Sequence, residues 1–241
     1  MRLRFIFVAV CLFLYVFIGL LCYPFYILSN RRMFNFLVRF CAVMVLKLAG
    51  IKFEVTGLEH ITPGEKYLIV SNHQSIVDIP VIAAALPVNL RIFAKKEIAR
   101  VPLFGQVIWL YDFVFVDRRS RYNSVKSVKV MAKKMKFCSF LVFPEGTRTK
   151  TGFVGRFKSA CLFPAFDNSV RVLPVALLDA NKIVAPGKQE VRRGTVHLKV
   201  FEPVTPLEGE SRQELADRLQ KIIADYVDPT VGPKPEEEAE G

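Results

Sequence analysis

Hydrophobic and polar residues divide the chain into an apolar N-terminal stretch and a longer region in which short apolar runs recur. Residues 5–30 contain no charged side chain and are dominated by Phe, Leu, Val and Ile, a run long enough to cross a bilayer. Residues 33–50 are also apolar, but Arg39 and Lys47 interrupt them, as in an amphipathic helix at a membrane interface. We therefore expect residues 1–50 to form a membrane-anchoring helical segment, either a hairpin within one leaflet or one span followed by an interfacial helix. A hairpin packed only against protein is the alternative.

From residue 51 onward, apolar runs of four to eight residues alternate with amphipathic stretches. Runs of this length that are rich in branched and aromatic residues are typical of buried strands. The pattern predicts strands over residues 53–56, 67–70, 91–94, 113–116, 138–143, 170–177 and 195–201. It predicts helices from about 75–78 to 86 and over 122–136, 158–166 and 214–226.

Strands that alternate with helices imply an α/β fold, here an αβα sandwich around a mixed, mainly parallel sheet. We assign residues 51–228 to this single domain. Residues 229–241 are rich in Pro and Glu, so we expect them to form an acidic disordered tail.

Composition and charge favour a membrane surface over nucleic acid as the partner. The formal net charge is +12, and residues 229–241 contain one Lys and four Glu, which leaves +15 on the rest of the chain. Such a surplus is typical of proteins that bind nucleic acid, an anionic membrane or an anionic substrate. The chain is 52% hydrophobic and has 21 Phe against 7 Tyr, and it contains neither an RNP-like signature nor zinc-finger spacing. We therefore expect a membrane partner and no nucleic-acid partner.

Cysteine usage and flanking charge indicate the compartment. The five Cys show no C-x-x-C spacing, so we interpret them as reduced residues of a cytosol-facing protein. If the apolar stretch spans a membrane, the basic residues after it outnumber Arg2 and Arg4 before it, which also places the domain in the cytoplasm. The expected location is membrane-associated, at the inner membrane if the source is bacterial.

The most informative polar stretch is residues 71–78, Ser-Asn-His-Gln-Ser-Ile-Val-Asp, which follows a predicted buried strand. Open α/β sheets bind ligands in such strand-to-helix loops, so His73 lies where chemistry is expected. Asp78 could hold one imidazole nitrogen and leave the other free as a general base. Ser75 and Asp78 also fit a capping box, in which Asp78 only satisfies the first turn of a helix. This stretch alone leaves both interpretations open.

Charged groups follow three other predicted strands. These groups are Lys95, Asp117-Arg118 and Glu145-Gly146-Thr147-Arg148. The carboxyl ends of parallel strands meet at one edge of a sheet, so all of them could share a cleft with His73.

Within such a cleft the groups would suit an anionic ligand. Gly146 would let the backbone approach the ligand closely, and Arg148 could bind a phosphate with two hydrogen bonds. For Lys95 and Arg148 a solvated surface charge is the alternative, and Glu145 could simply cap a helix or pair locally. No His, Cys or carboxylate spacing typical of a metal site is present, so no metal is expected.

Four sequence blocks resemble, in order and spacing, those of the glycerolipid acyltransferases, specifically the 1-acylglycerol-3-phosphate (lysophosphatidic acid) acyltransferases. Asn72-His73 through Asp78 resembles the family's N-H-x-x-x-x-D block. The other blocks are Lys95-Lys96-Glu97 with Val101-Pro102-Leu103-Phe104-Gly105 and Phe115-Val116-Asp117-Arg118, then Phe143-Pro144-Glu145-Gly146-Thr147-Arg148, and finally Val172-Leu173-Pro174-Val175. Four blocks in order are more specific than any one of them. The resemblance therefore favours a catalytic role over capping for Asp78.

The resemblance implies an acyltransferase of phospholipid biosynthesis. Such an enzyme moves a fatty acyl group from a thioester, acyl-CoA or acyl-carrier protein, to the sn-2 hydroxyl of lysophosphatidic acid and gives phosphatidic acid. His73, oriented by Asp78, would be the general base. The residues implied to bind the substrate phosphate are Glu145, Gly146, Thr147 and Arg148, with Lys95 and Arg118 as weaker candidates. No cofactor is implied besides the acyl donor as co-substrate.

Two alternatives accompany this expectation. The same chemistry could act on another lysophospholipid or on a lyso-aminolipid, or the chain could be a catalytically silent protein that binds anionic membranes. Lys158-Ser159-Ala160 stands where many family members have Lys-x-Gly, and this departure leaves the preferred acceptor open.

Overall fold

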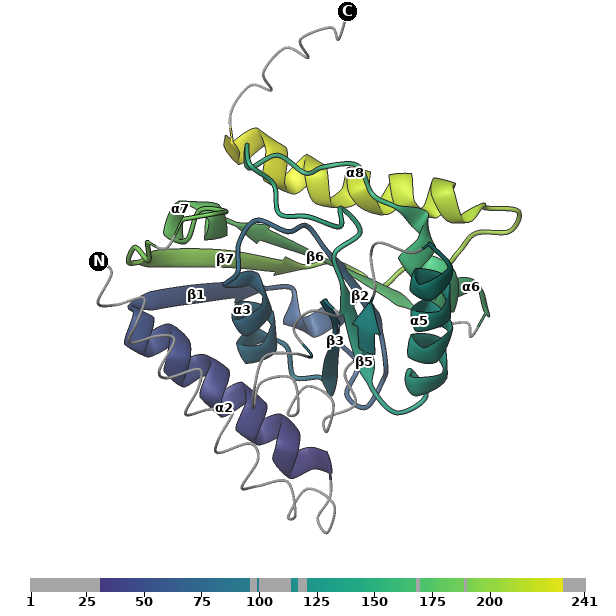
Figure 1. The fold of residues 1–241 in the computed structure, drawn as a ribbon, viewed down its shortest axis with the longest axis horizontal. Coiled ribbons are helices and arrows are strands. Elements are labelled where there is room, and N and C mark those ends of the chain that lie inside the picture. The colour runs from purple at the N-terminus through teal and green to yellow at the C-terminus, as the bar shows by residue number, and fades with distance from the viewer. Residues whose placement is uncertain are drawn as a thin grey trace, which may run out of the picture.

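The computed structural model describes residues 31–95, 99, 114–116, 121–167, 170–188 and 190–231. Within these residues a seven-stranded sheet lies between two layers of helices (Figure 1). The strands are β1 (Ile51–Thr56), β2 (Leu68–Ser71), β3 (Leu90–Lys95), β4 (Val114–Val116), β5 (Ser139–Val142), β6 (Val172–Leu178) and β7 (Gly194–Val200). The α-helices are α2 (Arg31–Ala49), α3 (Asp78–Ala85), α5 (Arg121–Lys134), α6 (Phe163–Asp167), α7 (Ala180–Ile183) and α8 (Arg212–Val231). Two 3₁₀ turns are η1 (Leu58–His60) and η3 (Ser159–Leu162).

The sheet is mixed and mainly parallel, with the strand order β1-β7-β6-β2-β5-β3-β4. Every described pairing is parallel except that of β6 with β7. Strand β2 lies at the centre, where Leu68 pairs with Phe140 of β5 and with Val172 of β6. Because β2 and β5 are parallel neighbours, the loop after Ser71 and the loop after Val142 leave the sheet at the same edge.

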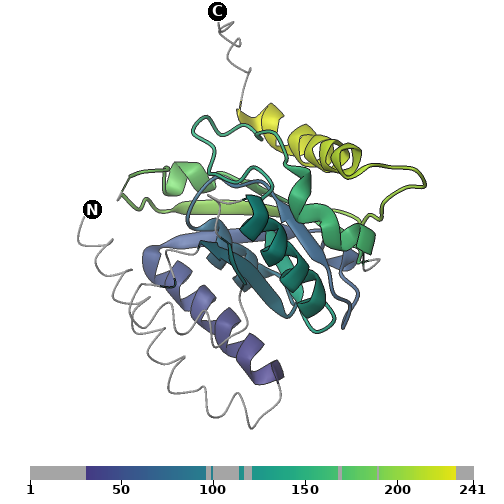
Figure 2. The same cartoon turned by 45° about the vertical axis from the view of Figure 1, so that its right-hand side comes forward.

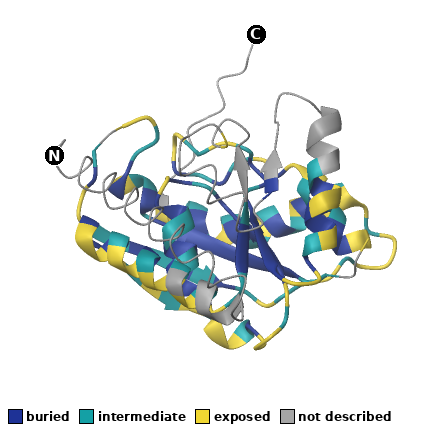
Figure 3. Cartoon of the chain, turned by 60° about the horizontal axis from the view of Figure 1, so that its bottom comes forward, coloured by how far each residue is buried: buried dark blue, intermediate teal, exposed yellow. Residues whose placement is uncertain are grey.

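Side chains alternate between the two faces of the sheet, so each face has its own hydrophobic core. On β2, Ile69 joins the core under α2 and α3, while Leu68 and Val70 join the core under α5, α6 and α8. All of β2 and β5 is buried, which explains their almost uninterrupted apolar sequences (Figure 3).

Helix α2 covers the opposite side of the sheet from α8 (Figure 2). Its inner side packs against α3 and β1, and Ala42, Leu46 and Ala49 are buried in the core. The Arg39 guanidinium donates a hydrogen bond of 2.8 Å to the carbonyl of Ala84, near the end of α3. Residues 31–49 of the predicted anchoring segment are therefore part of the packed domain, because their heptad-like apolar residues meet the sheet layer.

The remainder of the predicted N-terminal hairpin, residues 1–30, lies outside the described residues. No helix in the described part of the chain is both long and apolar enough to cross a membrane. The outer side of α2 nevertheless carries exposed apolar side chains, namely Phe36, Phe40, Val43, Met44 and Leu48.

Element ends differ from the sequence-based expectations by a few residues in most cases. The expected helix over residues 158–166 begins as the 3₁₀ turn η3 before it continues as α6. Helix α8 runs from Arg212 to Val231 and so includes three residues that we expected in the disordered tail. Pro229 lies in the last turn of α8, where its missing N–H costs one backbone hydrogen bond close to the helix end, and the Thr230 hydroxyl donates to the Val227 carbonyl at 2.7 Å.

Candidate active site

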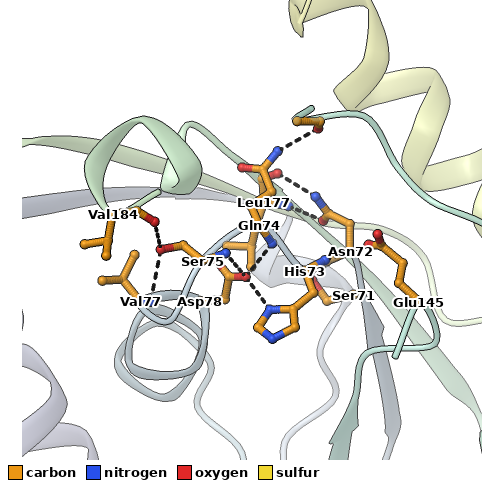
Figure 4. Close-up of polar contacts among 11 residues, drawn as sticks. Ser71, Asn72, His73, Gln74, Ser75, Val77, Asp78, Glu145, Leu177 and Val184 are labelled. Carbon is orange, nitrogen blue, oxygen red and sulfur yellow. Dashed lines mark hydrogen bonds and ion pairs between the residues drawn. The ribbon is translucent and has the colours of Figure 1, made fainter. Parts of the chain in front are cut away.

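His73 lies in the loop between the carboxyl end of β2 and the start of α3 (Figure 4). Its Nδ1 is 2.7 Å from Oδ2 of Asp78, and the His73 side chain is 16% exposed while that of Asp78 is 0% exposed. The ring nitrogen that faces a carboxylate oxygen acts as the donor, so we assign the proton to Nδ1. The Nε2 atom is then the basic nitrogen of the ring.

Asp78 serves the histidine and the helix start with the same oxygen. Besides Nδ1 of His73, its Oδ2 accepts hydrogen bonds from the backbone N–H groups of Gln74 at 2.7 Å and of Ser75 at 2.8 Å. The Ser75 hydroxyl donates to the carbonyl of Val184 at 2.6 Å, so only the carboxylate half of the expected capping box forms. The two interpretations of the sequence are thus not exclusive, because one carboxylate meets both needs.

Burial and hydrogen bonding act on the Asp78 carboxyl in opposite directions. Burial raises its pKa above the ordinary value, whereas the hydrogen bonds and charge from His73, followed by the N–H groups of Ser75 and Gln74, lower it. The net direction is upward. These donors nonetheless all converge on one oxygen and therefore stabilise the ionised form that orients the imidazole.

The histidine loop is anchored to β6 by Asn72, which precedes His73. The amide of Asn72 donates to the carbonyl of Leu177 at 2.9 Å and accepts from the N–H of Leu177 at 2.8 Å (Figure 4). This pair of bonds imitates a strand pairing beyond the end of β2. An Asn at this position is therefore required by the geometry of the loop, a role that the sequence block alone did not reveal.

The segment after β5 brings the Phe-Pro-Glu-Gly-Thr-Arg block against the histidine. The ring of Phe143 stacks on the imidazole of His73 with centroids 4.0 Å apart and an angle of 15° between the planes. The backbone N–H of Thr149 donates to the carbonyl of His73 at 2.8 Å. Two distant sequence blocks are thus joined at one residue, as the expected meeting of parallel strand ends requires.

Glu145 differs from the expectation that it would contact a phosphate. Its side chain is turned into the protein, and the residue is only 7% exposed. Oε1 accepts the backbone N–H of His73 at 2.8 Å, and Oε2 accepts the backbone N–H of Gly155 at 3.1 Å. Because both oxygens have backbone donors and a carboxylate repels a phosphate, the geometry supports a role in holding the loops instead.

Burial also raises the pKa of Glu145 to about 7. The N–H groups of His73 and Gly155 lower it, and the charges of Asp78 and Asp228 raise it further. Its ordinary value is 4.5, so this carboxyl changes its protonation near neutral pH in the folded protein.

Gly146 and Arg148 lie in the turn that follows Glu145. Gly146 has a φ of +75°, and a Cβ at this position would lie 3.2 Å from Nζ of Lys158, so glycine permits both the turn and the approach of the lysine. Arg148 is half-buried and Thr147 is exposed. In the described residues, neither Arg148 nor Lys158 pairs with a carboxylate, which leaves two cations on this turn available to an anion.

Lys158 was noted in the sequence but was given no role there. A backbone contact holds Lys158 close to Gly146, because the N–H of Lys158 donates to the carbonyl of Pro144 at 3.1 Å. Of the other expected cations, Lys95 ends β3, but its side chain is not among those described, and Arg118 lies outside the described residues.

Comparison with known proteins gives consistent matches. A family described as Acyltransferase matches residues 52–178. The chain is 28% identical over 211 residues to the human 1-acyl-sn-glycerol-3-phosphate acyltransferase alpha, which covers 85% of this chain and 74% of that protein. It is 32% identical over 154 residues to the 1-acyl-sn-glycerol-3-phosphate acyltransferase of Borreliella burgdorferi, which covers 62% of this chain and 60% of that protein. The crystal structure of the 1-acyl-sn-glycerophosphate (LPA) acyltransferase PlsC from Thermotoga maritima superposes with a TM-score of 0.82 at 27% identity, over 98% of this chain and 96% of that chain.

Proposed function

The chain belongs to the acyltransferase family, and from that premise we propose that it transfers a fatty acyl group from a thioester to the sn-2 hydroxyl of lysophosphatidic acid. The product is phosphatidic acid, an intermediate of phospholipid biosynthesis. The names of the similar human, Borreliella burgdorferi and Thermotoga maritima proteins, all acyltransferases of 1-acyl-sn-glycerol-3-phosphate, support this choice of acceptor. The observation that carries the proposal is the 2.7 Å contact between His73 and the fully buried Asp78.

In the proposed reaction His73 is the general base. Nε2 takes the proton of the acceptor hydroxyl while that oxygen attacks the thioester carbonyl carbon, and the negative charge of Asp78 stabilises the imidazolium that results. When the tetrahedral intermediate collapses, the carbon–sulfur bond breaks and the departing thiolate receives the proton from Nε2. The acyl group ends on the acceptor oxygen, and the histidine returns to its neutral form.

The acceptor phosphate is assigned to the turn that carries Arg148. A guanidinium binds a phosphate through two parallel hydrogen bonds, and a half-buried position strengthens them relative to water. The ammonium of Lys158 lies against the same turn and adds a second positive charge. Lys95 and Arg118 remain candidates for the same role.

The lipid substrate and product imply that the enzyme works at a membrane surface. The exposed apolar side chains on the outer side of α2 and the net charge of +12 support association with an anionic bilayer. We assign the domain to the cytoplasmic side, where acyl-CoA and acyl-carrier protein are available as donors.

The test compares wild type with His73→Ala, using His197→Ala as the matched control. Detergent-solubilised protein is incubated with lysophosphatidic acid and acyl-CoA, or acyl-carrier protein, and thiol release is followed. We expect release that requires the acceptor and a fall in kcat of about 10²–10⁴-fold in His73→Ala alone. Equal rates for wild type and His73→Ala would overturn the assignment of the base. If wild type released no thiol from either acyl-CoA or acyl-carrier protein, the assignment of lysophosphatidic acid as the acceptor would be overturned.

A further inference from the structure

The C-terminal helix α8 is fastened to the segment 152–157, which follows the Arg148 turn. Oδ1 of Asp228 accepts the backbone N–H of Val154 at 3.0 Å. About two turns earlier on α8, Oε1 of Gln220 accepts the backbone N–H of Phe157 at 3.2 Å. Polar side chains of α8 therefore hold this segment by its backbone, at two positions three residues apart.

The same segment holds the histidine loop from its other side. Between the two anchored positions, the N–H of Gly155 donates to Oε2 of Glu145, and Oε1 of Glu145 accepts the N–H of His73. A second connection runs from the side-chain amide of Gln74 to the carbonyl of Gly152 at 3.2 Å (Figure 4). These hydrogen bonds, together with the short backbone of the segment, thus connect α8 to the backbone N–H of His73 and to the side chain of the next residue, Gln74.

The contact at Gly155 leaves little freedom in this set. A Cβ on Gly155 would lie 2.9 Å from Oε2 of Glu145, so any other residue here would force the carboxylate to shift. The carboxylates of Asp228 and Glu145 also accept from adjacent residues of the segment, Val154 and Gly155. Movement of the segment by a fraction of an ångström would therefore shift Glu145 and with it His73.

We propose that α8 is a positioning element for the general base, with Asp228 as the positioning residue that fixes segment 152–157. The inference rests on the proposed function only in its use of acyl transfer as a readout. Asp228 touches neither substrate nor the imidazole in this scheme. It acts through Glu145, which accepts the backbone N–H of His73 and so fixes the backbone position from which the His73 ring projects toward the acceptor hydroxyl.

A general structural role for Asp228 is distinguishable from this one. The docking of α8 depends on its apolar side, where Leu215, Leu219, Ile223 and Val227 are fully buried against the sheet. Asp228 lies beyond that apolar side and contributes a hydrogen bond to a loop. Its loss should therefore leave α8 docked while the segment loses its anchor at Val154, with Phe157 still held by Gln220.

The experiment uses the full chain and three substitutions. Asp228→Ala removes the acceptor for Val154, and Asp228→Asn keeps an oxygen in its place. Asp225→Ala is the matched control, because Asp225 lies on the same helix but pairs with Lys221 on the surface at 2.8 Å. Thiol release with lysophosphatidic acid gives kcat and KM, thermal unfolding gives Tm, and hydrogen exchange reports the amides of Gly155 and His73.

For Asp228→Ala we expect a kcat about tenfold below wild type at an unchanged donor KM, because a base displaced by about 1 Å can lose up to 10²-fold in rate. Exchange at the two amides should be faster, while Tm stays close to that of wild type. Asp228→Asn should recover most of the rate, and Asp225→Ala should match wild type.

Two results would overturn the inference. In the first, Asp228→Ala has the kcat of wild type and the same amide protection. In the second, Asp228→Ala loses activity only to the extent that its lower Tm explains. If wild type itself does not acylate lysophosphatidic acid, the proposed function fails, but amide exchange in the Asp228 variants still decides whether α8 holds the loop.

Discussion

Two histidine–carboxylate pairs lie in different regions of the part of the chain that the structure describes, and they differ in burial more than in distance. His73 and Asp78 are 2.7 Å apart at the carboxyl end of β2, and the Asp78 side chain is 0% exposed. His197 and Glu54 are 3.2 Å apart on neighbouring strands β7 and β1, and the Glu54 side chain is 71% exposed. Contact between an imidazole and a carboxylate is therefore not by itself evidence of catalysis.

The difference lies in what holds the carboxylate. Asp78 accepts two backbone N–H groups in addition to the imidazole, so its position is fixed before any substrate arrives. Glu54 extends into solvent from an edge strand, where water competes for its oxygens and the pair is worth about 0–1 kcal/mol. The buried pair can direct a proton, whereas the exposed pair is a cross-strand surface contact.

Asp78→Asn should separate the two pairs most sharply. An amide could place its oxygen where Oδ2 lies, but it lacks the negative charge that stabilises the imidazolium. We expect kcat to fall by about 10²–10⁴-fold with little change in KM. Glu54→Gln is the matched control in the same thiol-release assay and should retain the wild-type rate. Equal losses in both variants would show that burial of the carboxylate does not distinguish the pairs.

Glu145→Gln extends the comparison to the second buried carboxyl beside His73. Burial raises the pKa of Glu145 to about 7 from its ordinary 4.5. Between these values the folded protein holds a proton that the unfolded chain releases, so this group lowers the free energy of unfolding as the pH rises. The stability that this group contributes is fully present below pH 4.5. As the pH rises past 7, the free energy of unfolding falls by up to roughly 3 kcal/mol because of this group.

Denaturant unfolding of wild type and Glu145→Gln at pH 5 and pH 8 measures this effect. The glutamine of the variant does not ionise, so its free energy of unfolding does not fall in this way. Relative to wild type, Glu145→Gln should therefore be more stable at pH 8 than at pH 5. His73, Asp78 and Asp228 are the other titratable groups near Glu145, and they are present in both proteins. An identical pH dependence in wild type and variant would refute the assigned pKa.

Arg148→Ala tests whether the region around His73 binds the phosphate of the acceptor as well as holding a base. The region around His197 is expected to do neither. Loss of a charged hydrogen bond costs about 1.5–3 kcal/mol, which should appear mainly as a raised KM for lysophosphatidic acid. A monoacylglycerol acceptor without the phosphate should show no such penalty. Lys150→Ala removes an exposed cation two residues away and serves as the control. A raised KM for both acceptors would argue against a phosphate contact.

The smallest effect is expected for the exposed pair itself. A double-mutant cycle of His197→Ala and Glu54→Ala should give a coupling free energy of unfolding below about 1 kcal/mol, because both groups are solvated. The coupling should weaken further at high salt. A coupling of several kcal/mol would mean that the surface pair is as strongly organised as the buried one.

Much of the fold and of the candidate site could be predicted from the sequence. The strands β2 and β5 are short, mainly apolar runs, and such runs have few alternatives to a buried position in a sheet. Once these strands are parallel neighbours, the polar residues after each of them must meet, and His73 does contact Phe143 and Thr149. His197 lies half-exposed on β7, between the buried Val196 and Leu198.

Other features depend on packing between distant segments. Glu145 follows a strand in the manner of a ligand-binding residue, but the backbone N–H groups of His73 and Gly155 turn it inward. Residues 33–50 have the pattern of an interfacial helix, yet one side of α2 meets α3 and β1. In both cases the local sequence pattern indicates only whether a residue is polar or apolar, and not which distant segment it will contact.

The sequence by itself determined where most strands and helices lie along the chain. It also determined which blocks carry the chemistry and which family the chain belongs to. Only the tertiary structure decided which oxygen of Asp78 receives the imidazole, that Glu145 holds loops, and that α8 reaches segment 152–157 through Asp228. The physical reason is that apolar periodicity is set by neighbours a few residues apart, whereas a hydrogen bond requires a donor and an acceptor within about 3 Å, however far apart they are in the chain.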